Sequence, residues 1–326
     1  MTERGEELRA ASHAVRAAAR VCAAVQRELV QADSYEKKDK SPVTVADYAS
    51  QAVVCAHLER ALPKDRIVGE EDAAELRGEQ VDVRRRVVER VAVELGKDVT
   101  EARVLDWIDL GGASADGERY WTLDPIDGTT GFLRGEQYAV ALALIERGEV
   151  VLGVLGCPNL PYAGGTGGLF VAQHGGGVKA FSLWDEKAPG VDVRVAPPAT
   201  LAEARFCESV ESGHSDQDQS QQIARQLGIR SEPYRIDSQC KYAAVARGDA
   251  SIYLRLPTRK DYREKIWDHA AGKLVVEAAG GRVTDVDGAP LDFTHGRTLA
   301  RNAGVVATSG AIHDAVIEAV REALGR

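Results

Sequence analysis

The sequence predicts an α/β protein built in two parts. In the first part, two long helical patterns precede apolar runs that pair as hairpins, which is typical of an α+β domain. In the second part, segments 204–209, 217–227, 250–254 and 267–279 alternate between strand and helix patterns, as in an α/β domain. A proline-rich seam at 195–198 lies between the two parts. We therefore expect one domain over residues 1–192 and a second over residues 193–326.

The composition is that of a soluble globular protein. Hydrophobic residues make up 44% and charged residues 28% of the 326 residues. No apolar run approaches the roughly 18 residues that are needed to cross a bilayer, so we expect no membrane partner. The net charge of −9 argues against a broad nucleic-acid surface. It permits a small anionic substrate, because nearby cations and metals decide local binding.

The N-terminus and the cysteines both favour the cytoplasm. Residues 1–7 lack the basic and then apolar order of a secretory signal, and they contain acids that a transit peptide lacks. The five cysteines are odd in number and have no paired spacing, which argues against a disulfide framework or a zinc site. Cys22 falls on the apolar face of the first helical pattern, so we expect it to be a core residue.

Two helical patterns open the chain. The first covers residues 4–31, and the second follows a polar loop and runs from about residue 43 to Leu62, where Pro63 ends it. Thr44 and Asp47 have the offset of a capping box, so Asp47 is expected to support the start of the second helix. A helix start would also hold a catalytic carboxylate rigidly.

A short strand after the second helical pattern is followed directly by acidic residues. Residues 66–69 form a short apolar strand that breaks at Gly69 into Glu70, Glu71 and Asp72. A charge run usually forms a solvated face, but an acid directly after a buried strand and a glycine is a candidate for chemistry. Residues 81–95 read as an arginine-rich surface helix between polar loops, with no visible chemistry.

A second strand, residues 120–123, leads into the segment on which the rest of the chain depends. Pro125 is expected to stop this strand, and Gly128 to allow a tight turn into a helix that starts at Thr129. Free backbone amides after Gly128, at the positive end of that helix, would face a phosphate.

The acids in this segment suit a metal site. Hard divalent cations prefer carboxylate and carbonyl oxygens, so Asp124, the carbonyl of Ile126 and Asp127 could share metal ions. The alternative is an ordinary Asp-Pro turn followed by an acidic N-cap.

Two hairpins follow. Residues 138–145 and 149–156 flank an Arg-Gly turn, and residues 169–173 and 178–183 flank a second turn that begins at His174. The glycines at 175–177 invite a phosphate-loop interpretation, but no Gly-Lys-Ser/Thr follows them. We therefore expect a hairpin turn with His174 exposed.

The central segment resembles a known family. Residues 124–129 read DPIDGT, which is similar to the signature of the metal-dependent, lithium-sensitive phosphatases of the inositol monophosphatase superfamily. Residues 131–137 read GFLRGEQ and resemble one branch, the 3′(2′),5′-bisphosphate nucleotidases. The resemblance extends from about Ser41 to Asp285. It implies a layered αβαβα sandwich, with the active site in the cleft between an α+β domain and an α/β domain.

The resemblance implies roles for residues of four motifs, of which the 124–129 signature is one. Residues 40–47 are similar to the family segment whose aspartate helps to activate the attacking water, residues 69–71 to its second metal motif, and residues 267–272 to its last. His269 in that last motif is expected to be structural. The implied catalytic residues are Asp47 and Thr129, and the implied metal ligands are Glu70, Asp124, Ile126, Asp127 and Asp268.

Three segments of the second half resemble the nucleotide-binding segments of the bisphosphate branch. They cover residues 209–215, 237–242 and 253–257, in the same order as in the family. The implied substrate contacts are Gly128, Thr129, His214, Ser238, Lys241 and Arg255.

These features lead to a functional prediction. Oxygen donors without His or Cys suit Mg²⁺ rather than zinc, and the family resemblance implies two or three ions. It also implies a cytoplasmic monomer that hydrolyses the 3′-phosphate of adenosine 3′,5′-bisphosphate to AMP and phosphate, with the sulfated relative PAPS as a further substrate. Asp47 and the Thr129 hydroxyl would orient and deprotonate the water. The alternatives are an inositol phosphate 1-phosphatase and a catalytically silent metal-sensing regulator.

Overall fold

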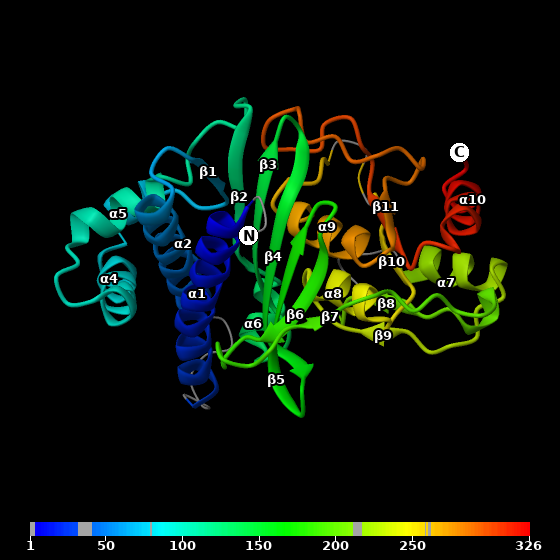
Figure 1. The fold of residues 1–326 in the computed structure, drawn as a ribbon, viewed down its shortest axis with the longest axis horizontal. Helices are drawn as coiled ribbons and strands as arrows, with labels where there is room; N and C mark the ends of the chain where they lie inside the picture. The colour runs from blue at the N-terminus through cyan, green and yellow to red at the C-terminus, as the bar shows by residue number, and fades with distance from the viewer. Residues whose placement is uncertain (1–3, 32–40, 79, 211–216, 258, 260–261) are drawn as a thin grey trace.

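Five layers of secondary structure stack in the order helix, sheet, helix, sheet, helix (Figure 1). The computed structural model describes residues 4–31, 41–78, 80–210, 217–257, 259 and 262–326. This arrangement confirms the predicted α/β fold and its αβαβα layering. Each layer buries the apolar face of its neighbour, which is the reason that such stacks are stable.

The first layer consists of two long helices, α1 (Gly5–Gln31) and α2 (Ser41–Ala61), that pack against each other and against one face of the larger sheet. The predicted capping box is wrong, because α2 begins at Ser41 and therefore Thr44 and Asp47 lie inside the helix. Three shorter helices flank this layer: α3 (Ala74–Arg77), α4 (Val81–Leu95) and α5 (Glu101–Asp109). Helix α5 was not predicted from the sequence. Its N-cap is Thr100, whose side chain accepts a hydrogen bond from the Arg103 amide at 3.3 Å.

The second layer is a seven-stranded sheet whose strands follow the order of the chain. Only the pair β1–β2 is parallel, and the remaining neighbours are antiparallel. Both predicted hairpins are confirmed, and His174 is exposed in the second turn. The strands are β1 (Arg66–Gly69), β2 (Arg119–Asp127), β3 (Ala139–Glu146), β4 (Glu149–Tyr162), β5 (Gly165–Gln173), β6 (Gly177–Ser182) and β7 (Val191–Asp192).

Strand β2 does not stop at Pro125, which corrects the prediction. The strand continues to Asp127, and its register with β3 shifts between Asp124, which lies opposite Ala141, and Asp127, which lies opposite Ala139. Proline has no N–H to donate, so a central strand accommodates it at a bulge, where the ladder is already interrupted.

The third layer lies between the two sheets. It consists of α8 (Cys240–Arg247) and α9 (Ala270–Ala278), which contact strands of both sheets. Helix α8 was not predicted. Helix α9 was expected to begin at residue 267 but begins at Ala270, so Asp268 lies in the turn before it.

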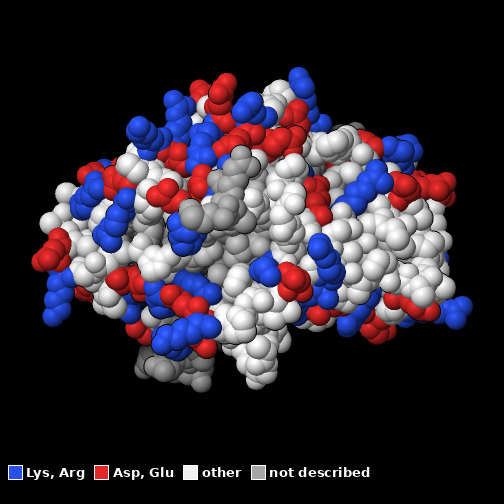
Figure 2. All heavy atoms as spheres, viewed as in Figure 1, with Lys and Arg blue, Asp and Glu red and all other residues white. Residues whose placement is uncertain are grey.

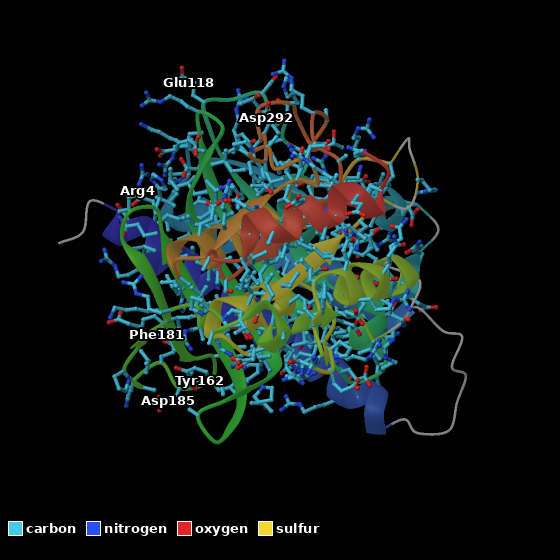
Figure 3. The ribbon with its side chains drawn as sticks, turned by 90° about the vertical axis from the view of Figure 1, so that its right-hand side faces the viewer. Arg4, Glu118, Tyr162, Phe181, Asp185 and Asp292 are labelled. Atoms are coloured by element: carbon cyan, nitrogen blue, oxygen red, sulfur yellow. The ribbon has the colours of Figure 1, made fainter. Side chains whose placement is uncertain are left out.

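The last two layers belong to the second half of the chain. A five-stranded sheet has the order β11 (Arg282–Thr284), β12 (Val305–Thr308), β10 (Ile252–Arg255), β8 (Phe206–Glu208), β9 (Tyr234–Arg235). Its outer face is covered by α7 (Gln217–Gln226) and α10 (His313–Ala323), seen side by side in yellow-green and red in Figure 3. A 3₁₀ turn, η1 (Leu201–Glu203), precedes β8.

The two halves share a buried boundary. The Tyr120 hydroxyl of β2 donates a hydrogen bond to the carbonyl of Phe293 at 3.0 Å, and one apolar cluster contains residues from both sheets. The division into domains at residues 192 and 193 therefore stays a prediction. All five cysteines are buried and unpaired, Cys22 included.

The surface of the described residues shows mixed charge. On the face in Figure 2, positive and negative side chains are interspersed rather than gathered into one broad patch. In the part of the chain that the structure describes, no helix is both long and apolar enough to span a membrane.

Candidate active site

A cavity of about 210 Å³ collects most of the predicted site residues. It lies where the end of β2 meets α8, β10 and the turn before α9. Asp47 does not line it, and His214 lies outside the described residues. The predicted residues that line the cavity are Glu70, Asp124, Ile126, Asp127, Gly128, Thr129, Ser238, Lys241, Arg255 and Asp268.

The bulge in β2 brings Asp124 and Asp127 to the same cavity. Residues three apart in a regular strand point to opposite faces, whereas one extra residue restores a common side. The Gln239 amide donates a hydrogen bond to Asp127 Oδ2 at 2.5 Å. By contrast, Asp124 Oδ1 is buried and has no hydrogen-bond partner among the described residues.

Helix α2 fixes the ends of both strands that carry the acids. The Ser50 hydroxyl donates to the carbonyl of Pro125 at 2.9 Å. Gln51 donates to the carbonyl of Glu71 at 2.6 Å and accepts from the Glu71 amide at 3.1 Å. Asp47 lies one turn earlier on the same helix and is buried, with 7% of its surface exposed. The helix therefore holds Asp47 in a fixed relation to both strand ends.

Arg297 connects the Glu70 strand to the turn that carries Asp268. Its guanidinium donates to the carbonyl of Gly69 and to that of Gly111, the latter at 3.4 Å, and lies over the Trp267 ring at 4.7 Å. A residue near the C-terminus thus joins two segments that each supply one acid.

The carboxylates of the cavity repel one another. Burial, followed by the charges of Glu70, Asp127 and Asp268, raises the pKa of Asp124 well above its usual range. Burial and nearby acids also raise the pKa of Glu70 and of Asp268 to about 7. Burial raises the pKa of Asp127 too, although Lys241 opposes this shift. Such a cluster is destabilising unless protons or cations neutralise it.

The acidic wall fits a divalent cation. Its donors are all oxygens, which Mg²⁺ prefers. Among the described residues, the buried Asp124 Oδ1 has no hydrogen-bond partner, and a cation would supply one. Ile126 lines the same cavity and lies in the irregular part of β2, between the residues that pair with β3. Ion binding would also remove the repulsion that raises the pKa values.

The opposite wall of the cavity is cationic. Lys241 is 5% exposed, its Nζ donates to the Ser209 hydroxyl at 3.1 Å, and it lies 5.3 Å from the centre of the Tyr253 ring. Burial lowers the pKa of Lys241, against the opposing charge of Asp127. Arg255 lies nearby at the end of β10. The cavity therefore pairs an acidic wall suited to a cation with a wall suited to an anion.

The turn after β2 brings the two walls together. Gly128 has a φ of 89° and caps the short helix α6 (Thr129–Leu133), so the predicted helix start at Thr129 is confirmed. A Cβ at Gly128 would lie 2.8 Å from the Cβ of Ser238, which itself has a φ of 65°. Only glycine allows this close approach of the two halves.

Several residues of the cavity were not predicted as site residues. Arg134 forms an ion pair with Asp237, whose other oxygen accepts from the Val210 amide at 3.1 Å. Both charged residues lie inside segments that had been singled out for their family resemblance, 131–137 and 237–242. The ion pair itself could not be predicted, because it joins residues that are far apart in the sequence. The further lining residues are Thr130, Gly131, Arg134, Ser209, Asp237, Gln239, Tyr253 and His269.

The chain is similar to enzymes of known function over most of its length. It is 45% identical to the 3′(2′),5′-bisphosphate nucleotidase of Emericella nidulans, with 88% of this chain and 90% of the relative covered. It is 46% identical to that of Schizosaccharomyces pombe, with 90% and 87% covered. For 3′(2′),5′-bisphosphate nucleotidase 1 of Arabidopsis thaliana the identity is 46%, with 98% and 96% covered.

Solved structures share the fold. An inositol monophosphatase from Anabaena superposes with a TM-score of 0.63 at 23% identity, covering 99% of this chain and 97% of that one. Mycobacterium tuberculosis SuhB superposes with a TM-score of 0.64 at 21% identity, covering 100% and 99%. The model of the inositol monophosphatase family matches residues 6–324, and the chain belongs to this family.

Proposed function

We propose that the protein is a Mg²⁺-dependent 3′(2′),5′-bisphosphate nucleotidase. It would hydrolyse the 3′-phosphate of adenosine 3′,5′-bisphosphate to AMP and phosphate, and would accept PAPS as a further substrate. The observation that carries the proposal is one cavity in which a carboxylate cluster faces Lys241 and Arg255. Relatives about 45% identical that bear this enzyme name support it. A monomer acting in the cytoplasm is part of the proposal.

The residues of the acidic wall would carry the hydrolysis. Glu70, Asp124, Asp127, Asp268 and the Ile126 carbonyl would hold two or three Mg²⁺ ions. Bound Mg²⁺ supplies a water of lowered pKa and neutralises charge on the phosphoryl group.

Asp47 and Thr129 would act on the attacking water. Asp47 is buried behind the cluster, where burial and the charges of Glu71 and Glu70 raise its pKa well above the usual range. A carboxylate with a raised pKa is a better proton acceptor near neutral pH. The hydroxyl of Thr129, at the first position of α6, would help to orient the water.

The cationic wall would select the substrate. A bisphosphate carries a second phosphate that is not cleaved, and Lys241 and Arg255 would neutralise it, with Ser238 and Gly128 alongside. His214 belongs to this proposal from the sequence resemblance alone. An inositol monophosphate would leave the two cations without a phosphate to bind.

The first prediction concerns metal and pH. In chelated protein, the folded state keeps protons on Glu70 and Asp268 up to about pH 7, whereas the unfolded chain releases them near pH 4. Their contribution to stability is therefore present at about pH 4 and is lost as the pH rises to about 7. Mg²⁺ should restore it, so the increase in Tm that Mg²⁺ causes should be larger at pH 8 than at pH 5.5.

The measurement is thermal unfolding in EDTA and in excess Mg²⁺ at a series of pH values. Asp268→Asn, which removes one of the repelling charges, should show a smaller increase at pH 8. An effect of Mg²⁺ on Tm that is the same at every pH would contradict this account of the cluster.

The second prediction separates chemistry from structure at Asp47. Asp47→Asn keeps the size of the side chain but removes the base, so kcat should fall by about 10²–10⁴ while Tm changes little. A control is Asp82→Asn on the exposed first turn of α4, which should leave kcat unchanged. If the Asp47 variant unfolds at lower temperature but keeps its kcat per folded molecule, Asp47 is structural.

The third prediction concerns substrate class. Lys241→Met and Arg255→Met should each lower kcat/KM for adenosine 3′,5′-bisphosphate by about tenfold or more, since a charge-assisted contact is lost. Rates on AMP and inositol 1-phosphate should be low in the wild type and should change little. Lys179→Met, which alters an exposed lysine paired with Asp192, is the matched control.

Equal losses on both kinds of substrate would place these cations outside the phosphate-binding site. A wild-type preference for inositol phosphates would overturn the assignment.

A further inference from the structure

Arg255 is held from behind by a buried carboxylate. Its Nε donates to Glu264 Oε1 at 3.3 Å, and Glu264 is only 6% exposed. The contact uses the Nε edge of the guanidinium rather than its terminal amino groups. A guanidinium fixed in this way keeps its fork for a second anion, and phosphate groups are bound through such forks.

Glu264 is in turn fixed by a hydrogen-bonded chain. Its Oε2 lies 3.2 Å from His269 Nε2, and His269 Nδ1 lies 2.7 Å from the Tyr242 hydroxyl. An ionised carboxylate only accepts, so Nε2 donates to Glu264, and in the neutral imidazole Nδ1 accepts from Tyr242. All three side chains lie between the sheets, where they have little freedom to move.

The same chain extends to the second cation of the cavity. The Tyr242 ring meets the Tyr253 ring edge to face at 5.0 Å, and Lys241 Nζ lies 5.3 Å from the centre of Tyr253. Gly272 of α9 leaves the room that the Tyr242 ring needs, because a Cβ there would overlap it. One buried network therefore runs from Arg255 to Lys241.

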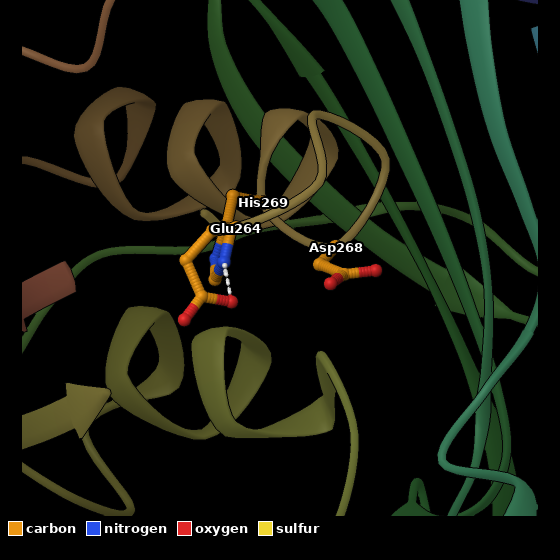
Figure 4. A group of neighbouring side chains, drawn as sticks. All are labelled: Glu264, Asp268 and His269. Atoms are coloured by element: carbon orange, nitrogen blue, oxygen red, sulfur yellow. Dashed lines mark hydrogen bonds and ion pairs between the residues drawn. The ribbon is translucent and has the colours of Figure 1, made fainter. Parts of the chain in front are cut away.

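Glu264, Asp268 and His269 also have ligand atoms within 4.8 Å of one another, a spacing at which they could hold a metal ion. The contacts argue against one. Both ring nitrogens of His269 already have hydrogen-bond partners, so neither is open to a metal. Figure 4 shows Glu264 and His269 facing each other, while the Asp268 carboxylate points away from them.

We propose that Glu264 is a positioning residue for substrate binding, acting through Arg255. It holds the guanidinium in the orientation that receives the phosphate that is not cleaved, and the His269–Tyr242 pair holds Glu264. This inference rests on the proposed function and goes beyond it by assigning the origin of the geometry of Arg255.

The test is a double-mutant cycle between Glu264→Gln and Arg255→Met. Glutamine keeps the shape of the side chain but loses the charge, so Glu264→Gln should raise KM for adenosine 3′,5′-bisphosphate by about tenfold, with kcat nearly unchanged. In the Arg255→Met background the same substitution should change KM by less than about twofold, because the residue through which it acts is gone. Glu277→Gln, which removes the α9 partner of Lys273, is the matched control and should have no effect.

Dissociation constants for AMP, measured by calorimetry on the same four proteins, provide a readout that does not need turnover. AMP keeps the phosphate assigned to Arg255, so its affinity should follow the same non-additive pattern. If Glu264→Gln does not fold, Glu264→Asp, which retains the charge at a shorter reach, replaces it in the cycle with a smaller expected effect.

Additive losses, in either KM or AMP affinity, would overturn the proposal, as would a Glu264 effect of equal size on KM for inositol 1-phosphate. If the AMP affinities of the four proteins are non-additive but the wild type does not hydrolyse the bisphosphate, the proposed function is refuted and the role of Glu264 is supported. If the AMP affinities are additive and the wild type does not hydrolyse the bisphosphate, both the proposed function and the role of Glu264 are overturned.

Discussion

Repulsion among carboxylates at the end of β2 is the constraint on which the rest of the structure depends. Asp124 lies near Glu70, Asp127 and Asp268, and burial, followed by the charges of these acids, raises the pKa of Asp124. Such a cluster lowers the stability of the metal-free protein. It persists because the surrounding elements fix its members. The buried Asp124 oxygen has no hydrogen-bond partner among the described residues, which supports our proposal that a cation completes the cluster.

Several elements of the fold hold these acids in place. The bulge in β2 carries Asp124 and Asp127. Helix α2 contacts the ends of β1 and β2 through hydrogen bonds of Gln51 and Ser50. Arg297 contacts both β1 and Trp267 in the turn before α9. The cations come from α8 and β10, on the other side of the cavity. Because Glu70, Asp124 and Asp127 come from the first half of the chain and both cations from the second, the cavity exists only where the two halves meet.

The local parts of this arrangement could be predicted from the sequence, and the contacts between distant segments could not. Asp124 and Asp127 lie in one short run with a recognisable signature, and the hairpins follow from alternation and turn residues. The bulge at Pro125 was missed because a proline inside a strand usually ends it. Helix α5 was taken for a loop and α8 was not recognised. Arg297 and Glu264 carry no local pattern, since their roles arise only when the chain has folded.

A cation at the acidic cluster is the central requirement of the proposed active site. The most direct test is a crystal structure of the protein grown with Mn²⁺ and AMP, with anomalous scattering recorded at the manganese edge. Anomalous peaks are expected within about 2.5 Å of carboxylate oxygens of Asp124, Asp127, Glu70 and Asp268, with octahedral oxygen ligation. A cluster without a peak, or a peak bound instead by Glu264 and His269, would contradict it.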